Sequence, residues 1–118
     1  MARKTPLTIV RQARALLAKG WCQIHRHRRY GEVDHYCASA ALSVAATGHH
    51  WRVFPQMKEV YAVLDRLARE ADPSTIGDVN PLTAFNDQIG RKQKEVVALF
   101  DRAIQEMTNN GSLPALPR

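Results

Sequence analysis

An alanine-rich segment in the first half of the chain places the strongest constraint on the fold. Residues 35–47 read HYCASAALSVAAT, carry no formal charge apart from one histidine, and are followed by Gly48. Alanine has the highest helix propensity, and glycine is typical of the position just after a helix. A helix that is apolar on nearly every side belongs at the centre of a bundle. We therefore predict a helix over residues 35–47, with Asp34 as its N-cap.

Three further segments repeat apolar residues every three or four positions, as amphipathic helices do. They cover residues 5–20, 54–71 and 91–107, and the second is the clearest of the three. Residues 72–90 hold several prolines and glycines, and we expect one short helical turn there, over residues 80–85. No segment alternates apolar and polar residues convincingly, so no sheet is predicted.

The predicted fold class is therefore all-α. We expect a single-domain bundle of four main helices, with a long connection before the last helix, over residues 1–108. The proline-containing residues 109–118 are expected to form a mobile tail. The longest apolar stretch, residues 37–46, falls well short of the roughly 20 residues that span a bilayer, so no membrane association is expected. Two cysteines are too few for a disulfide scaffold, and we expect reduced thiols in a bacterial-type cytoplasm.

Positive charge is concentrated in the first half of the chain. The net charge of +6 divides into +7 over residues 1–52, which carry nine basic and two acidic residues, and −1 over residues 53–118, which carry eight and nine. This asymmetry favours an acidic partner, either nucleic acid or an acidic protein surface. The alternative is that the charge serves solubility alone.

A run of basic residues follows the first helix, in a stretch without an apolar period that we interpret as a loop. Three guanidinium groups within four positions can form bidentate contacts with phosphates, and a tyrosine can stack on a base. The alternative is a solvated, charged loop. The candidate anion-binding or nucleic-acid-binding residues here are His25, Arg26, His27, Arg28, Arg29 and Tyr30.

The start of the last helix is a second candidate anion site. Helices usually carry acidic residues in the first turn, whereas the first turn here is basic and follows Gly90. Free backbone N–H groups surrounded by cations can bind an anion. The alternative is that Asp87 caps this helix and Glu95 pairs with Arg91. The candidate residues are Arg91, Lys92 and Lys94.

Asn86 and Asp87 precede this helix in a sequence typical of a turn. Asparagine and aspartate side chains bond the local backbone, so we predict that Asn86, Asp87 and Gly90 are structural turn or cap residues. The alternative makes Asp87 a general base or a magnesium ligand. No second carboxylate at an obvious spacing accompanies it.

Cysteines and histidines also gather around the basic loop. Four ligands of these types can hold zinc, but the spacings of Cys22, His25, His35 and Cys37 match no common zinc pattern well. A reactive cysteine needs exposure and a lowered pKa, whereas Cys37 falls on a helix face expected to be buried. We therefore predict no catalytic residue, no metal site and no cofactor.

Three short motifs, taken in order, resemble a known pattern. They are Gly20-Trp21-Cys22-Gln23, then Tyr36-Cys37 opening the alanine-rich helix, then Phe85-Asn86-Asp87 followed by Gly90-Arg91. Their order and spacing are similar to those of an uncharacterised family of small bacterial and phage proteins. Here Ser39-Ala40-Ala41-Leu42 stands in place of that family's Gly-Ala-Leu step, and Phe85 in place of its tryptophan. The resemblance implies a shared fold over most of the chain and carries no activity.

Three functional hypotheses follow from these residues. The leading one is a non-enzymatic binding protein, a phage or accessory protein that engages an acidic partner through the basic loop. The second is a homo-oligomeric helical module with no nucleic-acid role, which predicts an exposed apolar helix face around Phe54, Met57 and Tyr61. The third is a small hydrolase that uses Asp87, which requires a concave pocket with perturbed carboxylates.

Overall fold

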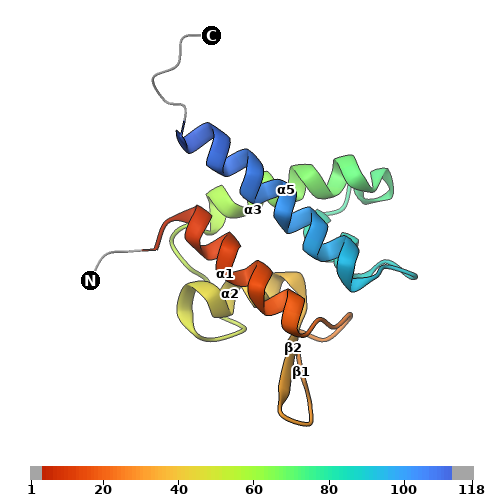
Figure 1. The fold of residues 1–118 in the computed structure, drawn as a ribbon. Helices are drawn as coiled ribbons and strands as arrows, with labels where there is room; N and C mark the ends of the chain where they lie inside the picture. Colours follow the sequence, from red (N-terminus) through yellow and green to blue (C-terminus); the bar gives the residue numbers. More distant parts are fainter. Residues whose placement is uncertain (1–3, 113–118) are drawn as a thin grey trace.

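The computed structural model describes the backbone of residues 4–112 and the side chains of residues 4–109. Within this range the chain is mostly helical, as predicted, but it also contains a two-stranded antiparallel sheet (Figure 1). The helices are α1 (Pro6–Lys19), α2 (Ala38–Thr47), α3 (Met57–Ala71), α4 (Pro81–Asp87) and α5 (Gln93–Ser112); η1 (Pro73–Thr75) is a 3-10 turn; the strands are β1 (His27–Tyr30) and β2 (Val33–Tyr36).

Helix α1 begins and ends where the sequence predicts. The Thr5 hydroxyl oxygen accepts a hydrogen bond from Thr8 N at 3.1 Å, and Pro6 occupies the first helical position. The helix ends at Gly20, where a Cβ atom would lie 2.3 Å from Asp34 O. Glycine is therefore required here by the close approach of strand β2. Helix α1 packs against α2, α3, α5 and β2, so it lies at the centre of the fold.

Residues 27–36 form a β-hairpin, which corrects the expectation of an all-α chain and of a loop over the basic run. The register pairs His27 with Tyr36 and Tyr30 with Val33. Gly31 opens the turn with a φ of +62°, a backbone conformation that favours glycine. Both faces of the hairpin carry charged and aromatic residues, so its strands show no apolar alternation. The hairpin projects from the helices (Figure 1).

Helix α2 begins at Ala38, three residues later than predicted. Asp34 belongs to β2 and is not the N-cap, because Cys37 takes that position and its sulfur accepts a hydrogen bond from Ala40 N at 3.4 Å. Gly48, with a φ of +85°, ends the helix as predicted. Five small side chains of α2 are buried, which lets neighbouring elements approach closely: Ala38, Ala40, Ala41, Ser43 and Ala45.

The long connection before the last helix holds η1 and α4. Asp65 of α3 accepts a hydrogen bond from Leu82 N at 3.0 Å and so caps the start of α4. Helix α5 begins at Gln93 and continues through Ser112, so the predicted tail at 109–118 overlaps its end, and residues 113–118 lie outside the described range. None of the described helices is both long and apolar enough to cross a membrane.

Candidate functional site

Asn86, in α4, is the centre of a buried polar cluster. The residue is 1% exposed. Its Oδ1 accepts hydrogen bonds from Trp21 Nε1 at 2.7 Å and from Ala38 N at 3.0 Å. Its Nδ2 donates to Cys22 O at 3.2 Å and to Asp87 Oδ1 at 2.8 Å. These bonds join α4 to the segment after α1 and to the first turn of α2, so three motifs that are distant in sequence meet at one side chain.

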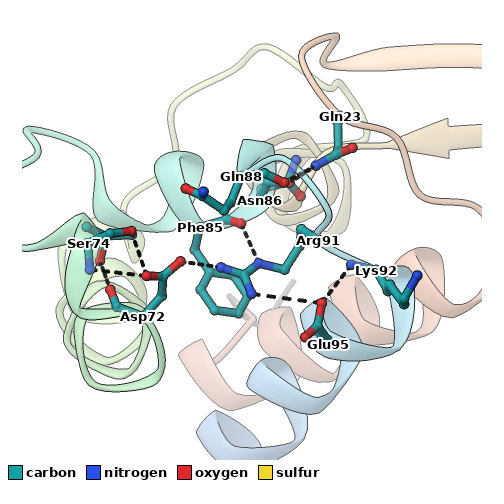
Figure 2. A network of polar contacts seen from close by, with 10 residues as sticks. Gln23, Asp72, Ser74, Phe85, Asn86, Gln88, Arg91, Lys92 and Glu95 are labelled. Carbon is teal, nitrogen blue, oxygen red and sulfur yellow. Dashed lines mark hydrogen bonds and ion pairs between the residues drawn. The ribbon is translucent and has the colours of Figure 1, made fainter.

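Asp87 and Gln23 complete this set of contacts, which we call the Asn86 cluster (residues 21–24 and 86–88). Asp87 Oδ1 accepts a hydrogen bond from Ile24 N at 2.8 Å, and Gln23 Nε2 donates to Gln88 O at 2.8 Å (Figure 2). Ile24 has a φ of +72°, which β-branched residues rarely adopt. Asp87 therefore holds a strained turn in place and does not cap the last helix.

The Arg91 side chain is mostly buried and binds other groups of this chain, so it is not free to bind an external anion. Its side chain is 12% exposed and lies 2.5 Å from Asp72 Oδ2, while its Nε donates to Phe85 O at 2.8 Å (Figure 2). The guanidinium also stacks over the Phe85 ring, 3.7 Å from its centroid. Hydrogen bonds from Ser74, reinforced by Arg91, hold the pKa of Asp72 below its usual value.

The carboxylate of Glu95 already occupies the candidate anion site at the start of α5. Glu95 Oε1 accepts a hydrogen bond from Lys92 N at 2.8 Å and lies 3.8 Å from Arg91 Nη1 (Figure 2). Of the two parts of that alternative, the pairing of Glu95 with Arg91 is present, whereas the cap by Asp87 is not. Lys92 and Lys94 are exposed at the surface, and Gly90 provides the left-handed turn before them with a φ of +84°. The second candidate anion site is thus reduced to two exposed lysines.

The first residues of the basic run are engaged with the rest of the molecule. Arg26 donates from Nε to His50 O at 2.7 Å and from Nη1 to Ser39 Oγ at 3.4 Å. His27 Nε2 lies 2.8 Å from Asp34 Oδ1, and this hydrogen bond lowers the pKa of Asp34. Arg26 and His27 therefore anchor the hairpin to the α2–α3 connection and to its own second strand.

The remaining basic residues point to opposite sides of the hairpin. Arg28 pairs with His35 and Arg29 with Asp34. Because successive strand residues face opposite sides, Arg28 shares one face with Tyr30, and Arg29 lies on the other. The guanidinium groups therefore do not form the single cluster that a loop would allow.

The two exposed arginines differ in how far their charge is balanced. Arg29 lies 3.5 Å from Asp34 Oδ1 with a side chain that is 58% exposed. Arg28 Nη2 lies 2.8 Å from His25 Nε2, and among the described residues no carboxylate forms an ion pair with Arg28. Tyr30, beside Arg28, is 59% exposed. Arg28 is therefore an outward-facing cation next to an exposed aromatic ring.

An open groove of about 520 Å³ lies beside this face of the hairpin. It is lined by Trp21, Ile24 and His25 from the segment before β1, and by Arg28 and Tyr30 from β1. Sequence reasoning missed this groove because Ile24, which is 73% exposed, stands alone in a polar stretch. The position of Ile24 depends on the hydrogen bond that its backbone N–H donates to Asp87, which no local pattern reveals.

A family model described as a family of unknown function (DUF6197) matches residues 1–106. The chain belongs to this family. The resemblance to an uncharacterised family is thereby confirmed. No curated protein and no solved structure matches the sequence, so DUF6197 membership assigns no activity.

The two cysteines of this DUF6197 member are buried thiols. Cys22 Sγ lies 3.2 Å from His25 O, and Cys37 Sγ accepts a hydrogen bond from Ala40 N. Burial raises the pKa of Cys22 to about 11 and also raises the pKa of Cys37. Both thiols therefore stay protonated at neutral pH, which makes them poor nucleophiles.

The helix face that the oligomer hypothesis required is packed in this DUF6197 member. Phe54 is buried, and Met57 and Tyr61 pack against the hydrophobic core. The Tyr61 hydroxyl also lies 2.6 Å from Ser39 Oγ. The predicted exposure is therefore wrong for Phe54, whereas Met57 and Tyr61 are partly buried. The oligomeric state itself stays a prediction.

Proposed function

We propose that this protein is a non-enzymatic binding module that engages an acidic macromolecular surface through its β-hairpin. The observation that carries the proposal is Arg28, a cation on a projecting hairpin with no carboxylate partner among the described residues (Figure 1). An unbalanced surface cation attracts negative charge over a distance set by the ionic strength. The excess of positive charge in residues 1–52 has the same sign.

The other candidate groups have structural partners, which concentrates the binding on the hairpin. Arg91 is paired with Asp72, and Arg26 with the His50 carbonyl. Asp87, the carboxylate of the hydrolase hypothesis, accepts a hydrogen bond from Ile24 N. The contact surface proposed here is therefore the face that carries Arg28 and Tyr30, together with His25. Lys92 and Lys94 are exposed at the start of α5.

The proposal is tested with two fluorescent acidic probes, polyglutamate and a single-stranded thymidine oligonucleotide. The variant Arg28→Glu is compared with Arg11→Glu, an exposed arginine of α1 that has the same effect on net charge. We expect Arg28→Glu to weaken binding of at least one probe about tenfold, and Arg11→Glu to weaken it less than about twofold. Circular dichroism checks that both variants are folded.

Salt dependence provides a second readout of the same contact. A complex between exposed charges should weaken steeply between about 25 and 200 mM salt, because the Debye length shortens over that range. Equal losses from Arg28→Glu and Arg11→Glu would mean that only bulk charge matters. That result, or binding of neither probe at low salt, contradicts the proposal.

A further inference from the structure

The outer edge of strand β1 has backbone groups without partners. Cys37 N donates to Arg26 O, so hydrogen-bonded pairs alternate along the register from that point. Arg28 and Tyr30 consequently bond to β2, whereas the N–H and C=O groups of His27 and Arg29 face away from it. Among the described residues, none is recorded as bonding these outward groups.

The outer edge of β2, in contrast, is already covered. Tyr36 N donates to Gly20 O at 3.1 Å, and Cys22 N donates to Tyr36 O at 3.1 Å. The segment after α1 thus acts as a partial third strand on that side, with a parallel bridge between Trp21 and Tyr36. Of the two edges of the described sheet, β1 is therefore the more open one, and its outward groups belong to His27 and Arg29.

Charge argues against a second copy of this chain on that edge. Two β1 strands side by side would bring Arg28 and Arg29 of each copy close to those of the other, and like charges on neighbouring strands are destabilising. An acidic strand would instead place carboxylates beside Arg28, which has no carboxylate partner among the described residues. Charge complementarity therefore favours an acidic occupant.

The composition around the edge favours a protein over a nucleic acid. Residues 25–36 carry three arginines against two acidic residues, an excess of only one positive charge, which is small for binding a polyphosphate. The adjoining groove offers the exposed aliphatic side chain of Ile24 and the exposed ring of Tyr30, which suit apolar residues of a peptide. Unpaired backbone N–H and C=O groups recognise another main chain.

We propose that an extended, acidic segment of a partner protein adds as a strand to the outer edge of β1. Its main chain pairs with Arg29, its carboxylates lie beside Arg28, and an apolar side chain enters the groove next to Ile24. This inference rests on the proposed function, because it names the class of acidic partner that the hairpin binds.

The test uses a capped peptide of about eight residues, a length typical of one strand, in which every second residue is alternately glutamate or valine and the residues between them are threonine. Its glutamates and valines therefore share one face, the face of Arg28 and the groove. Its control is the same peptide with N-methylated backbone amides, which keeps every charge and side chain but removes the donors for strand pairing. We expect the unmethylated peptide to bind at least about tenfold more tightly. Hydrogen exchange at the Arg29 amide should slow when it binds.

Two variants of Arg29 test the same edge from the protein side. Arg29→Ala removes the guanidinium, and Arg29→Pro removes the guanidinium together with the outward N–H, a substitution that edge strands tolerate. We expect Arg29→Pro to lose several-fold more affinity for the glutamate–valine peptide than Arg29→Ala. Amide spectra of both variants establish that the hairpin is intact.

The possible failures separate this inference from the proposed function. Equal binding of the methylated and unmethylated peptides, with binding still lost in Arg28→Glu, rejects strand addition and leaves charge-driven binding in place. Tighter binding of the thymidine oligonucleotide than of either peptide, again dependent on Arg28, also rejects a protein partner. If binding of every probe is insensitive to Arg28→Glu, both proposals are wrong.

Discussion

The Asn86 cluster and the β-hairpin are both rich in polar side chains, but they use them in opposite ways. Asn86 is buried, and its side-chain oxygen and nitrogen each make two hydrogen bonds within the molecule. Arg28 stands on the surface and has no carboxylate partner among the described residues. A buried polar group without partners is costly, whereas an exposed cation is solvated at little cost. The first region therefore stabilises the fold, and the second is available to a partner.

The largest expected difference between the two regions is in stability. Asn86→Ala leaves the Trp21 indole N–H and the Ala38 backbone N–H without their acceptor, and should lower the free energy of unfolding by about 3 kcal/mol. Arg28→Ala should change it by less than about 0.5 kcal/mol. Chemical denaturation of both variants measures the contrast, and similar losses would remove the distinction drawn between the two regions.

A substitution at Gly20 tests the close contact between the end of α1 and strand β2 of the hairpin. Gly20→Ala adds a Cβ atom 2.3 Å from Asp34 O, a distance that forces the backbone of β2 to move. We expect a loss of about 2 kcal/mol, in the range of overpacked sites. Lys19→Ala, at the preceding exposed position, is the matched control and should be nearly neutral. If Gly20→Ala left the free energy of unfolding unchanged, strand β2 would not pack this closely against the end of α1.

Arg91 is basic like the hairpin arginines, but it binds partners within the molecule as Asn86 does, so it provides a third test of the two regions. Arg91→Ala removes the Asp72 pair and the Phe85 stacking, and should cost about 1–2 kcal/mol of stability. It should leave binding of acidic probes within about twofold of the native protein. Lys92→Ala, its exposed neighbour, should leave stability unchanged. A large loss of binding in folded Arg91→Ala would restore Arg91 as a binding residue.

The smallest expected effect is a dependence of stability on pH. Because the pKa of Asp72 is lowered in the folded protein, chiefly by hydrogen bonds from Ser74, the ionised carboxylate stabilises the fold above its ordinary pKa near 3.8. This contribution is lost as the pH falls through the lower folded value. Asp72→Asn should therefore flatten the decline of stability at acidic pH, measured by thermal unfolding. An unchanged pH profile would show that Asp72 gains nothing from its partners.

The helices could be predicted from the sequence because their signals are local. Apolar residues at intervals of three and four, the Thr5-Pro6 start and the Gly48 end are all read within a few positions, and the structure has helices there. The hairpin could not be predicted in the same way, since its four-residue strands hold charged and aromatic residues on both faces. Gly31, which lies in the turn of the hairpin, was the one residue of this segment that indicated a tight turn.

The site was harder to predict because its contacts are distant in sequence. Arg91 meets Asp72 nineteen positions away, and Asn86 meets Trp21 sixty-five positions away. The sequence motifs drew attention to these polar residues, but only the fold shows which of them form hydrogen bonds and ion pairs within the molecule. The sequence shows the basic run as a group of neighbours, whereas strand alternation separates Arg28 from Arg29 in the fold.

Mapping the contact surface on the protein is the most direct measurement of the central claim, that the hairpin binds and the Asn86 cluster supports the fold. The glutamate–valine peptide is titrated into isotope-labelled protein at low salt, and changes in backbone amide signals are recorded. The account predicts that the changes fall on residues 25–30 and leave the amides of the Asn86 cluster and of Arg91 unmoved. Changes centred on Arg91 and Lys92, with an unaffected hairpin, would contradict it.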